Sequence, residues 1–190
     1  MTSDDWTIGQ ARALESLRGR SVERWVGVEL ALWDTEDNDG PRFGDATLPC
    51  LHLLGLQAAM TDGAAVSIDT YQDDAYYGLR TQQEARFDDA DGRWEGIFRR
   101  RALTELPVGQ VDQVAVFAAG GVLAEVDLRI DGRPLLLVAG ELDGTSEDGL
   151  LLHWLDDSVL AFTEPGAAGH ATWTMSRSDR RLITWRGGSA

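Results

Sequence analysis

The stretch "VLAEVDLRIDGRPLLLVAGEL", residues 122–142, decides the fold class. Val122, Ala124, Val126, Leu128 and Ile130 alternate with Leu123, Glu125, Asp127 and Arg129 over its first nine positions, a period of two that is typical of a half-buried β-strand. Asp131 and Gly132 follow, a dipeptide strongly favoured in tight hairpin turns. The chain then returns in a second apolar run with Pro134 near its start, where a missing N–H is tolerated. The stretch therefore predicts an antiparallel β-hairpin.

The same period of two recurs along most of the chain. A second hairpin is predicted where "TDG" at 61–63 separates two apolar runs. Further strands are predicted within 94–106, 111–118, 150–155, 158–162, 171–176 and 181–185. In the strand predicted over 21–33, one face has Val22, Val26, Val28, Leu30 and Leu32, and the other has Glu23, Trp25, Glu29 and Trp33.

A short helix is predicted near the N-terminus, because Ile8, Ala11, Leu14 and Leu17 recur every three residues before Gly19. The predicted fold is therefore α+β and predominantly antiparallel β, with one domain over residues 1–190. Both halves contain a strand, an Asp-Gly turn and a returning strand. That outline allows an internal duplication of two strand-rich halves, with a join near 106–109.

The charge of the chain points to a class of partner. Thirty-two acidic residues face seventeen arginines and no lysine, for a net charge of −15. Residues 34–91 hold thirteen acidic residues and three arginines, and residues 141–164 hold seven acidic residues and no arginine. Nucleic acids and anionic membranes attract basic surfaces, so neither is expected as a partner. A basic protein is the partner that this balance favours.

No metal or other cofactor is predicted, and folding is expected to need none. If the acidic loop "DTEDNDG" were an EF-hand with Gly40 at its sixth position, Thr35 and Ala46 would replace the first and last ligands. Cys50 and His52 would point the same way on a strand, but two ligands do not make a zinc site. As the single cysteine, Cys50 excludes an internal disulfide, and a buried thiol is expected.

Motifs for catalysis are missing, so a non-catalytic protein is favoured over an enzyme. The chain has no Gly-x-Ser-x-Gly elbow, no phosphate-binding GxxxxGK[ST] loop and no GxGxxG fingerprint. The segment "FRRRA" at 98–102 is expected to pair with the acidic blocks inside the fold. The acidic N-terminal "MTSDDWTIGQ" is unlike a signal peptide, and a cytoplasmic location is expected.

The first candidate binding stretch is "SIDTYQDDAYYGLR" at 67–80, which contains all three tyrosines of the chain. A binding surface is expected here, with aspartates that steer a partner and tyrosines that anchor it. The alternative is that tyrosines pack into the core and the aspartates form a turn. The candidate residues are Tyr71, Asp73, Asp74, Tyr76 and Tyr77.

The second candidate stretch is "HWLDDSVLAF" at 153–162, where Trp154, Asp156 and Asp157 could form an acidic, aromatic edge. The alternative is a corner between two strands, in which an aspartate bonds to backbone N–H groups.

These observations favour a non-catalytic protein-binding module, of the bacterial immunity or antitoxin kind, that neutralises a basic protein. One alternative is a small-molecule-binding or enzymatic β-rich domain with its site in a strand-lined cavity, marked by converging His, Asp and Trp side chains. Another is a structural protein whose acidic residues only maintain solubility.

Overall fold

The computed structural model describes residues 3–31, 33–34, 41–44, 49–87, 92, 94–146 and 149–184. Antiparallel strands dominate the described chain, and a helix precedes them, as predicted. None of the described helices is long and apolar enough to cross a membrane. The elements are α1 (Ser3–Glu15), β1 (Ser21–Leu30), β2 (Trp33–Asp34), β3 (Pro41–Arg42), β4 (Leu51–Met60), β5 (Ala65–Asp73), β6 (Tyr76–Gln82), β7 (Trp94–Glu95), β8 (Phe98–Ala102), β9 (Gly109–Ala119), β10 (Val122–Ile130), β11 (Arg133–Ser146), β12 (Gly149–Phe162), α2 (Pro165–His170), β13 (Thr172–Trp173), a 3₁₀ turn η1 (Arg177–Asp179) and β14 (Arg181–Leu182).

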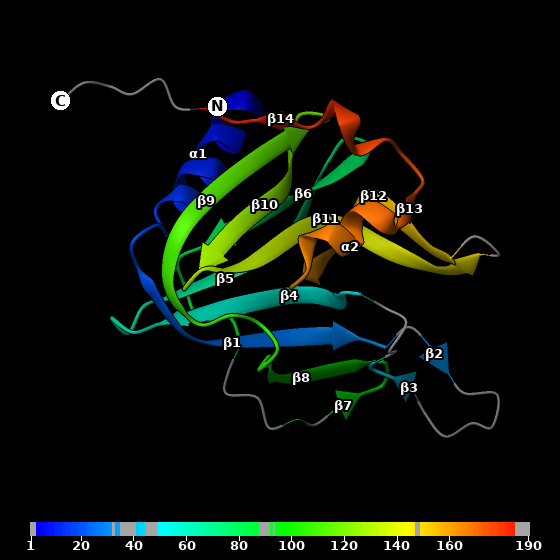
Figure 1. Cartoon of the computed structure of the whole chain (residues 1–190), viewed down its shortest axis with the longest axis horizontal. Helices are drawn as coiled ribbons and strands as arrows, with labels where there is room; N and C mark the ends of the chain where they lie inside the picture. Colours follow the sequence, from blue (N-terminus) through cyan, green and yellow to red (C-terminus); the bar gives the residue numbers. More distant parts are fainter. Residues whose placement is uncertain are drawn as a thin grey trace.

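Six of the strands form a closed ring in the order β1, β4, β12, β11, β10, β9 (Figure 1). Every neighbouring pair in the ring is antiparallel. The ring closes because β1 pairs with β4 along most of its length and with β9 at its first two residues. From this ring, β5 and β6 continue the sheet beyond β4, and β8 and β7 continue it beyond β1.

Both predicted hairpins form. β4 and β5 are joined by the turn at 61–63, and β10 and β11 by Asp131 and Gly132. The φ angles of Asp131 and Gly132 are 46° and 72°, the left-handed values that this two-residue turn requires. The internal duplication stays a prediction.

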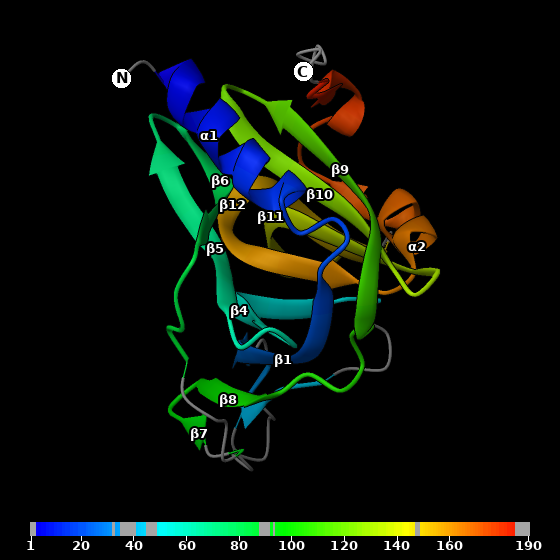
Figure 2. The same cartoon turned by 90° about the vertical axis from the view of Figure 1, so that its left-hand side faces the viewer.

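The ring encloses the larger hydrophobic core. Alternate residues of all six strands point inward, among them the predicted Val126, Leu128 and Ile130, all essentially inaccessible to solvent. α1 closes one end, where it lies beside β6 and β9 with Leu14 and Leu17 buried (Figure 2). Gln10 of α1 accepts a hydrogen bond from the backbone N–H of Thr81, which caps part of the β6 edge.

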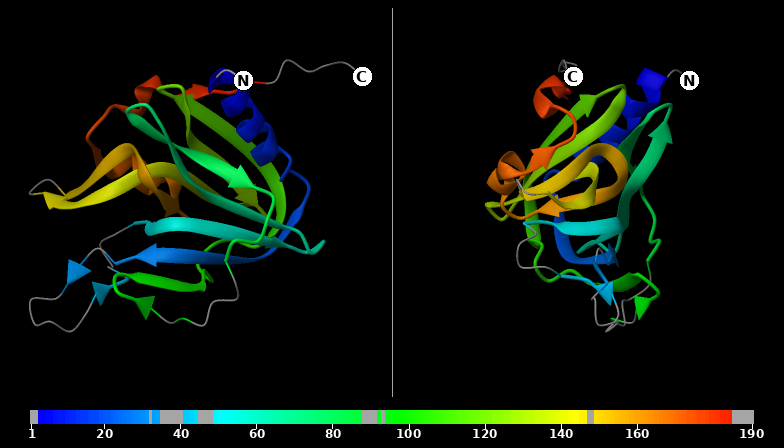
Figure 3. Two further views of the ribbon diagram at one scale, coloured as in Figure 1. Left: turned by 180° about the vertical axis from the view of Figure 1, so that it is seen from behind. Right: turned by 90° about the vertical axis from the view of Figure 1, so that its right-hand side faces the viewer.

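A second hydrophobic cluster lies on the outer face of the ring. Residues of β10, β11 and β12 with the opposite parity, such as Val138 and Phe162, pack beneath α2 and the segment after it. The β11–β12 hairpin runs on past the ring (Figure 3). The sheet is therefore apolar on both faces along these three strands, which matches the apolar run of β11 in the sequence.

The predicted faces of β1 are wrong in part. Trp25 and Glu29 are buried, whereas Val28 and Leu30 are only half-buried. A β-bulge between Val22 and Arg24 inserts one extra residue and reverses the alternation for the rest of the strand. Leu32, assigned to the same face, lies outside the described residues, as does the loop at 35–40.

Candidate functional site

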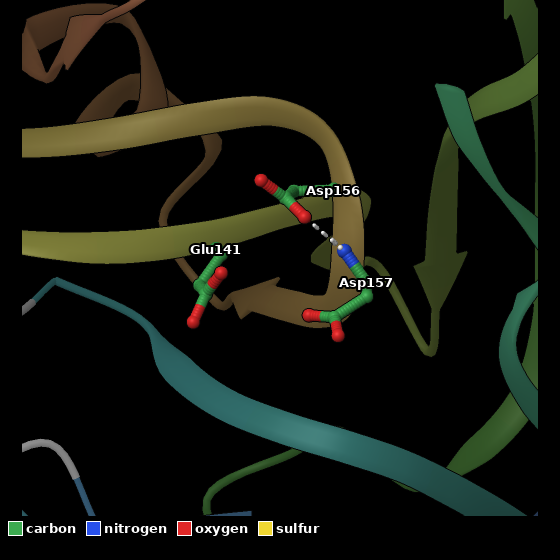
Figure 4. A group of neighbouring side chains, drawn as sticks. All are labelled: Glu141, Asp156 and Asp157. Carbon is green, nitrogen blue, oxygen red and sulfur yellow. Dashed lines mark hydrogen bonds between the residues drawn. The ribbon is translucent and has the colours of Figure 1, made fainter. Parts of the chain in front are cut away.

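Three carboxylates meet where β11 and β12 leave the ring. Glu141 lies on β11, and Asp156 and Asp157 lie on β12, with one oxygen of each side chain within 4.8 Å of the others (Figure 4). We call these three residues the acidic cluster. Glu141 and Asp156 are half-buried and Asp157 is exposed, so the cluster opens to solvent.

The cluster exists because β12 bends. Two separate strands were predicted on either side of residue 156, but the structure has one strand with a wide bulge. Ala139 pairs with Val159 and Gly140 with Trp154, so four residues of β12 have no counterpart on β11. As predicted for a corner, Asp156 Oδ1 accepts a hydrogen bond from the backbone N–H of Asp157, at 2.8 Å.

Gly140 permits this bend. A Cβ atom at this position would lie 2.5 Å from the carbonyl oxygen of His153, too close for any other residue. Leu155 adopts a φ of 62°, a left-handed conformation that costs a non-glycine residue about 1 kcal/mol or more. The backbone therefore carries local strain next to the carboxylates.

The acidic cluster is electrostatically unfavourable in the isolated chain. Burial raises the pKa of Glu141, and the charges of Asp157 and Asp156 raise it further. Across the described chain, no arginine forms an ion pair with any of the three carboxylates. His153 lies opposite Glu141 in the strand register, and its Nε2 is 3.0 Å from a carboxylate oxygen of Asp143.

Other buried carboxylates are neutralised by arginines. Glu125, on β10, is fully buried and binds Arg177 through two bonds, at 2.7 and 2.8 Å. Arg180 adds a third bond at 2.6 Å. The Arg177 guanidinium also lies 4.7 Å from the ring centroid of Trp173. Together these contacts hold the C-terminal segment against the outer face of the ring.

Glu29 and Asp69 repeat this arrangement. Glu29 is 2% exposed and binds Arg99 and Arg101, each at 2.6 Å. Asp69 binds Arg80 at 2.6 Å and also pairs with Arg86. Two arginines of "FRRRA", Arg99 and Arg101, thus pair with glutamates at 29 and 105 and not with the two acidic blocks. The Arg100 guanidinium lies 6.0 Å from the ring centroid of Phe87.

The tyrosine stretch forms the β5–β6 hairpin, and its residues separate into two groups. Tyr71 and Tyr76 are half-buried against the second hydrophobic cluster, over Gly78 and Gly120 respectively. Tyr71 also contacts Trp6, with 4.0 Å between the ring centroids. These two tyrosines therefore support the fold, in agreement with the core alternative.

Asp73, Asp74 and Tyr77 remain at the tip of this hairpin. Asp74 is exposed and forms the turn with a φ of 53°, while Asp73 is half-buried and pairs in register with Tyr76. Tyr77 is half-buried, pairs with Gln72, and lies on the opposite face of β6 from Tyr76.

The fold brings the two candidate stretches side by side. Thr70 of β5 donates a hydrogen bond to the backbone carbonyl of Asp157, at 2.6 Å. Thr70, Gln72 and Tyr77 lie on one face of the hairpin by the strand alternation and register. Tyr77 is therefore the tyrosine whose face of the hairpin contacts the bend that carries Asp157.

Trp154 lies elsewhere. Its side chain is 4% exposed and packs in the second hydrophobic cluster, and its Nε1 has no hydrogen-bond partner within the described part of the chain. The edge at 153–157 therefore turns its aromatic ring inward and its carboxylates outward. The acidic part of this candidate stretch is at the surface and the aromatic part is not.

Neither Cys50 nor His52 has the character of a reactive group. Burial raises the pKa of the Cys50 thiol to about 12 and lowers the pKa of His52 to about 4, so both are neutral at pH 7. A pocket of about 320 Å³ lies beside Cys50, with Glu105, Thr163 and Glu164 in its wall. Converging His, Asp and Trp side chains were the expected mark of a catalytic cavity, and none of the described residues that line this pocket is one of these three types.

Sequence reasoning missed one member of the acidic cluster. Glu141 was counted in an acidic block, but its position opposite the bend depends on the β11–β12 register. The glycine before it is the one available signal, since glycine inside a strand often marks a bulge or a close backbone approach. Comparison of the chain with protein-family models, with curated proteins and with solved structures finds no match.

Proposed function

We propose that the protein is a non-catalytic binding module that holds a basic segment of another protein at the acidic cluster. The observation that carries the proposal is a contrast inside the fold. Glu29, Asp69 and Glu125 each bind two arginines, whereas the acidic cluster brings three carboxylates together without an arginine from the described part of the chain. An arginine or lysine from a partner would complete the cluster as the chain's own arginines complete the other sites.

The energy available from this contact is substantial. Two unit charges about 4 Å apart repel by about 1 kcal/mol in water and by about 4 kcal/mol at an effective dielectric constant of 20. A guanidinium group bound among the carboxylates would remove this repulsion and add charge-assisted hydrogen bonds. The net charge of −15 would also draw a basic partner toward the protein and speed its association.

The tip of the β5–β6 hairpin extends the proposed surface. Asp74 is exposed there, and Tyr77 lies on the face of the hairpin that contacts Asp157 through Thr70. Tyrosine offers apolar area and a hydroxyl group at low entropy cost, which suits an anchor beside a charged contact. Of the three tyrosines, Tyr77 is therefore the proposed anchor.

An outer surface is favoured over an internal cavity as the functional site. Fully buried side chains such as Trp25, Leu53 and Leu56 fill the interior of the ring. Among non-catalytic binding modules, we propose a small acidic protein that neutralises a basic toxin, as immunity and antitoxin proteins do.

The test begins with a pull-down at low salt from the source organism, with captured proteins identified by mass spectrometry. Binding of a purified basic candidate is then measured for a triple variant, Glu141→Gln, Asp156→Asn and Asp157→Asn. The matched control is Glu23→Gln, Glu84→Gln and Glu164→Gln, which removes the same charge from three exposed positions. We expect association of the triple variant to slow by about tenfold at low salt, with the difference fading as salt rises.

Two results would contradict the proposal. Equal losses in the triple variant and the control would show that only the overall charge matters. Calorimetric binding of Ca²⁺ or Mg²⁺ by the native chain, lost in the triple variant, would assign the acidic cluster to a cation instead.

A further inference from the structure

The C-terminal segment, residues 172–184, lies on the outer face of the ring much as a separate peptide would. None of its residues is fully buried, and only Trp173, Arg177 and Ile183 are half-buried. It pairs with β12 and with β9 over two residues each, and the N–H of Ile183 adds a hydrogen bond to the carbonyl of Val116 (Figure 1). The segment is therefore held at a few points and has no core of its own.

The charge of the C-terminal segment is opposite to that of the chain. Its three arginines and one aspartate give a net charge of +2, whereas the whole chain carries −15. Arg177 and Arg180 both bind Glu125, whose side chain is fully buried. Charge-assisted bonds between guanidinium groups and carboxylates are also the means by which one protein holds the arginines of another. The segment thus shows which chemistry this face of the ring accepts.

The face beneath the segment combines an aromatic ring with a carboxylate. Phe117 of β9 lies directly opposite Glu125 of β10 in the strand register, so both side chains point to the same side of the sheet. The Arg180 guanidinium lies 5.2 Å from the ring centroid of Phe117, and its Nη1 lies 2.6 Å from the Glu125 carboxylate. A guanidinium is therefore bound here by a cation–π contact and an ion pair together.

The C-terminal segment leaves part of this site unfilled. A cavity of about 170 Å³ remains beside Arg180, with Phe117, Leu136 and Asp127 in its wall. Asp127 lies two positions after Glu125 on the same face of β10 and forms no ion pair within the described residues. A cavity of about 150 Å³ can hold a benzene molecule, so there is room for a further side chain. A segment with one more basic residue could contact both carboxylates.

We infer that the outer face of β9 and β10 is a second binding site, for an extended, arginine-bearing segment of a partner, and that the C-terminal segment occupies it as an internal competitor. The partner's strand would replace β14 on the edge of β9, since strand addition at a sheet edge is a common mode of peptide binding. Its arginines would replace Arg177 and Arg180, so Glu125 stays paired in both states. The inference does not depend on the acidic cluster.

The covalent link to the ring determines how strongly a partner must bind. A segment joined to its own site has an effective concentration on the order of millimolar. A free peptide of the same sequence should therefore displace it only near that concentration. A partner that also fills the cavity beside Asp127 should displace it at lower concentration.

A synthetic peptide with the sequence of residues 172–184 tests the inference on the native chain. Hydrogen exchange is measured at the amides of residues 181–183 of the protein while the peptide is added. Exchange should rise by about fivefold or more at millimolar peptide, because the chain's own strand leaves β9. A peptide of the same composition in scrambled order carries the same charge and should cause no rise.

A protein variant gives a second measurement. Arg177→Gln with Arg180→Gln removes the contacts of the internal competitor with Glu125. Fluorescence anisotropy should show that the labelled peptide binds this variant about tenfold tighter than the native chain. The matched control, Arg42→Gln with Arg181→Gln, removes the same charge from two exposed arginines and should bind like the native chain.

The aromatic ring can be tested in the same assay. Phe117→Leu, added to the variant that lacks Arg177 and Arg180, removes the ring that contacts the guanidinium. It should weaken binding of the peptide by about threefold.

Three outcomes would overturn the inference. Equal binding to the variant and to its control would show that the internal segment does not compete. Unchanged exchange at 181–183 of the native chain, at about 10 mM peptide, would show the same on an intact fold. Loss of peptide binding in the triple variant of the acidic cluster would assign the peptide to that cluster, a result that contradicts this inference and supports the proposed function.

Discussion

Glu125 and Glu141 lie on adjacent strands of one sheet, yet they differ in burial and in the charge of the side chains around them. Glu125 is fully buried and bound by two arginines, while Glu141 is half-buried and bordered by two aspartates. The first charge stabilises a tertiary contact, because it holds the C-terminal segment on the ring. The second has no arginine partner among the described residues, and burial together with the neighbouring aspartates raises its pKa. This difference distinguishes a carboxylate that stabilises the fold, Glu125, from one that we propose binds a partner, Glu141.

The largest effect is expected from Glu125→Ala. Removal of one partner from a buried ion pair costs about 3 kcal/mol or more, because the remaining charge stays partly desolvated. Arg177 would be left beneath Trp173 without its carboxylate. The free energy of unfolding from denaturant titration should fall by this amount, and hydrogen exchange should rise across 172–184. A loss below about 1 kcal/mol would place Glu125 with ordinary surface charges.

Glu29→Ala should cost less, about 2 kcal/mol. Arg101 would keep a second carboxylate, since Glu105 lies 2.5 Å away. The same denaturant titration, with Glu23→Ala as an exposed control on the same strand, measures the difference. A cost equal to that of Glu125→Ala would show that the second carboxylate does not compensate.

Glu141→Gln should stabilise the protein slightly, by about 0.5 kcal/mol at neutral pH. The pKa of Glu141 is raised in the folded state, so the folded state binds the proton more tightly than the unfolded state. Its favourable contribution is therefore present at low pH and is lost as the pH rises through the raised pKa.

Melting temperatures of the native chain and of Glu141→Gln, measured from acid to neutral pH, test this sign. The melting temperature of Glu141→Gln should exceed that of the native chain only as the pH rises toward neutral. His52, with its pKa lowered to about 4 by burial, destabilises both proteins equally as the pH falls from 6.5 toward 4, so the comparison cancels it. A variant less stable than the native chain at neutral pH would contradict the assignment.

The smallest effect is expected from a chelator. If the acidic cluster binds a basic side chain of a partner and not a metal ion, thermal melts with and without EDTA should coincide. A drop of several degrees on chelation would show that the fold itself uses a cation.

How much of this structure could be predicted from the sequence depends on how far apart in the chain the interacting residues lie. Local alternation and the Asp131–Gly132 turn are enough to specify the β10–β11 hairpin, because the interacting residues are neighbours in the chain. The inward position of Trp25 could not be predicted, since the single-residue bulge before it has no distinctive composition. The acidic cluster was found in part, because Asp156 and Asp157 adjoin in sequence whereas Glu141 joins them only through strand register.

The tyrosines illustrate the same limit. Tyr76 and Tyr77 are chemically identical neighbours, and alternation predicts only that they point to opposite faces. Which of them is packed depends on Gly120, 44 positions away, whose missing side chain leaves room for the Tyr76 ring. Such a pairing between distant residues leaves no local pattern in the sequence.

The closed ring has a consequence for how the chain reaches its native state. Val159 of β12 pairs with Leu53 of β4, 106 positions earlier. The β4–β12 pairing that closes the ring therefore joins two segments that are far apart in the chain and move independently until late in folding. The β10–β11 hairpin can form within about ten microseconds, but closure of so long a loop is penalised by chain entropy. We therefore expect refolding on a millisecond to second timescale, with formation of the β4–β12 pairing as the slow step. During synthesis on the ribosome, residues 51–53 of β4 must keep one edge unpaired until β12 has emerged.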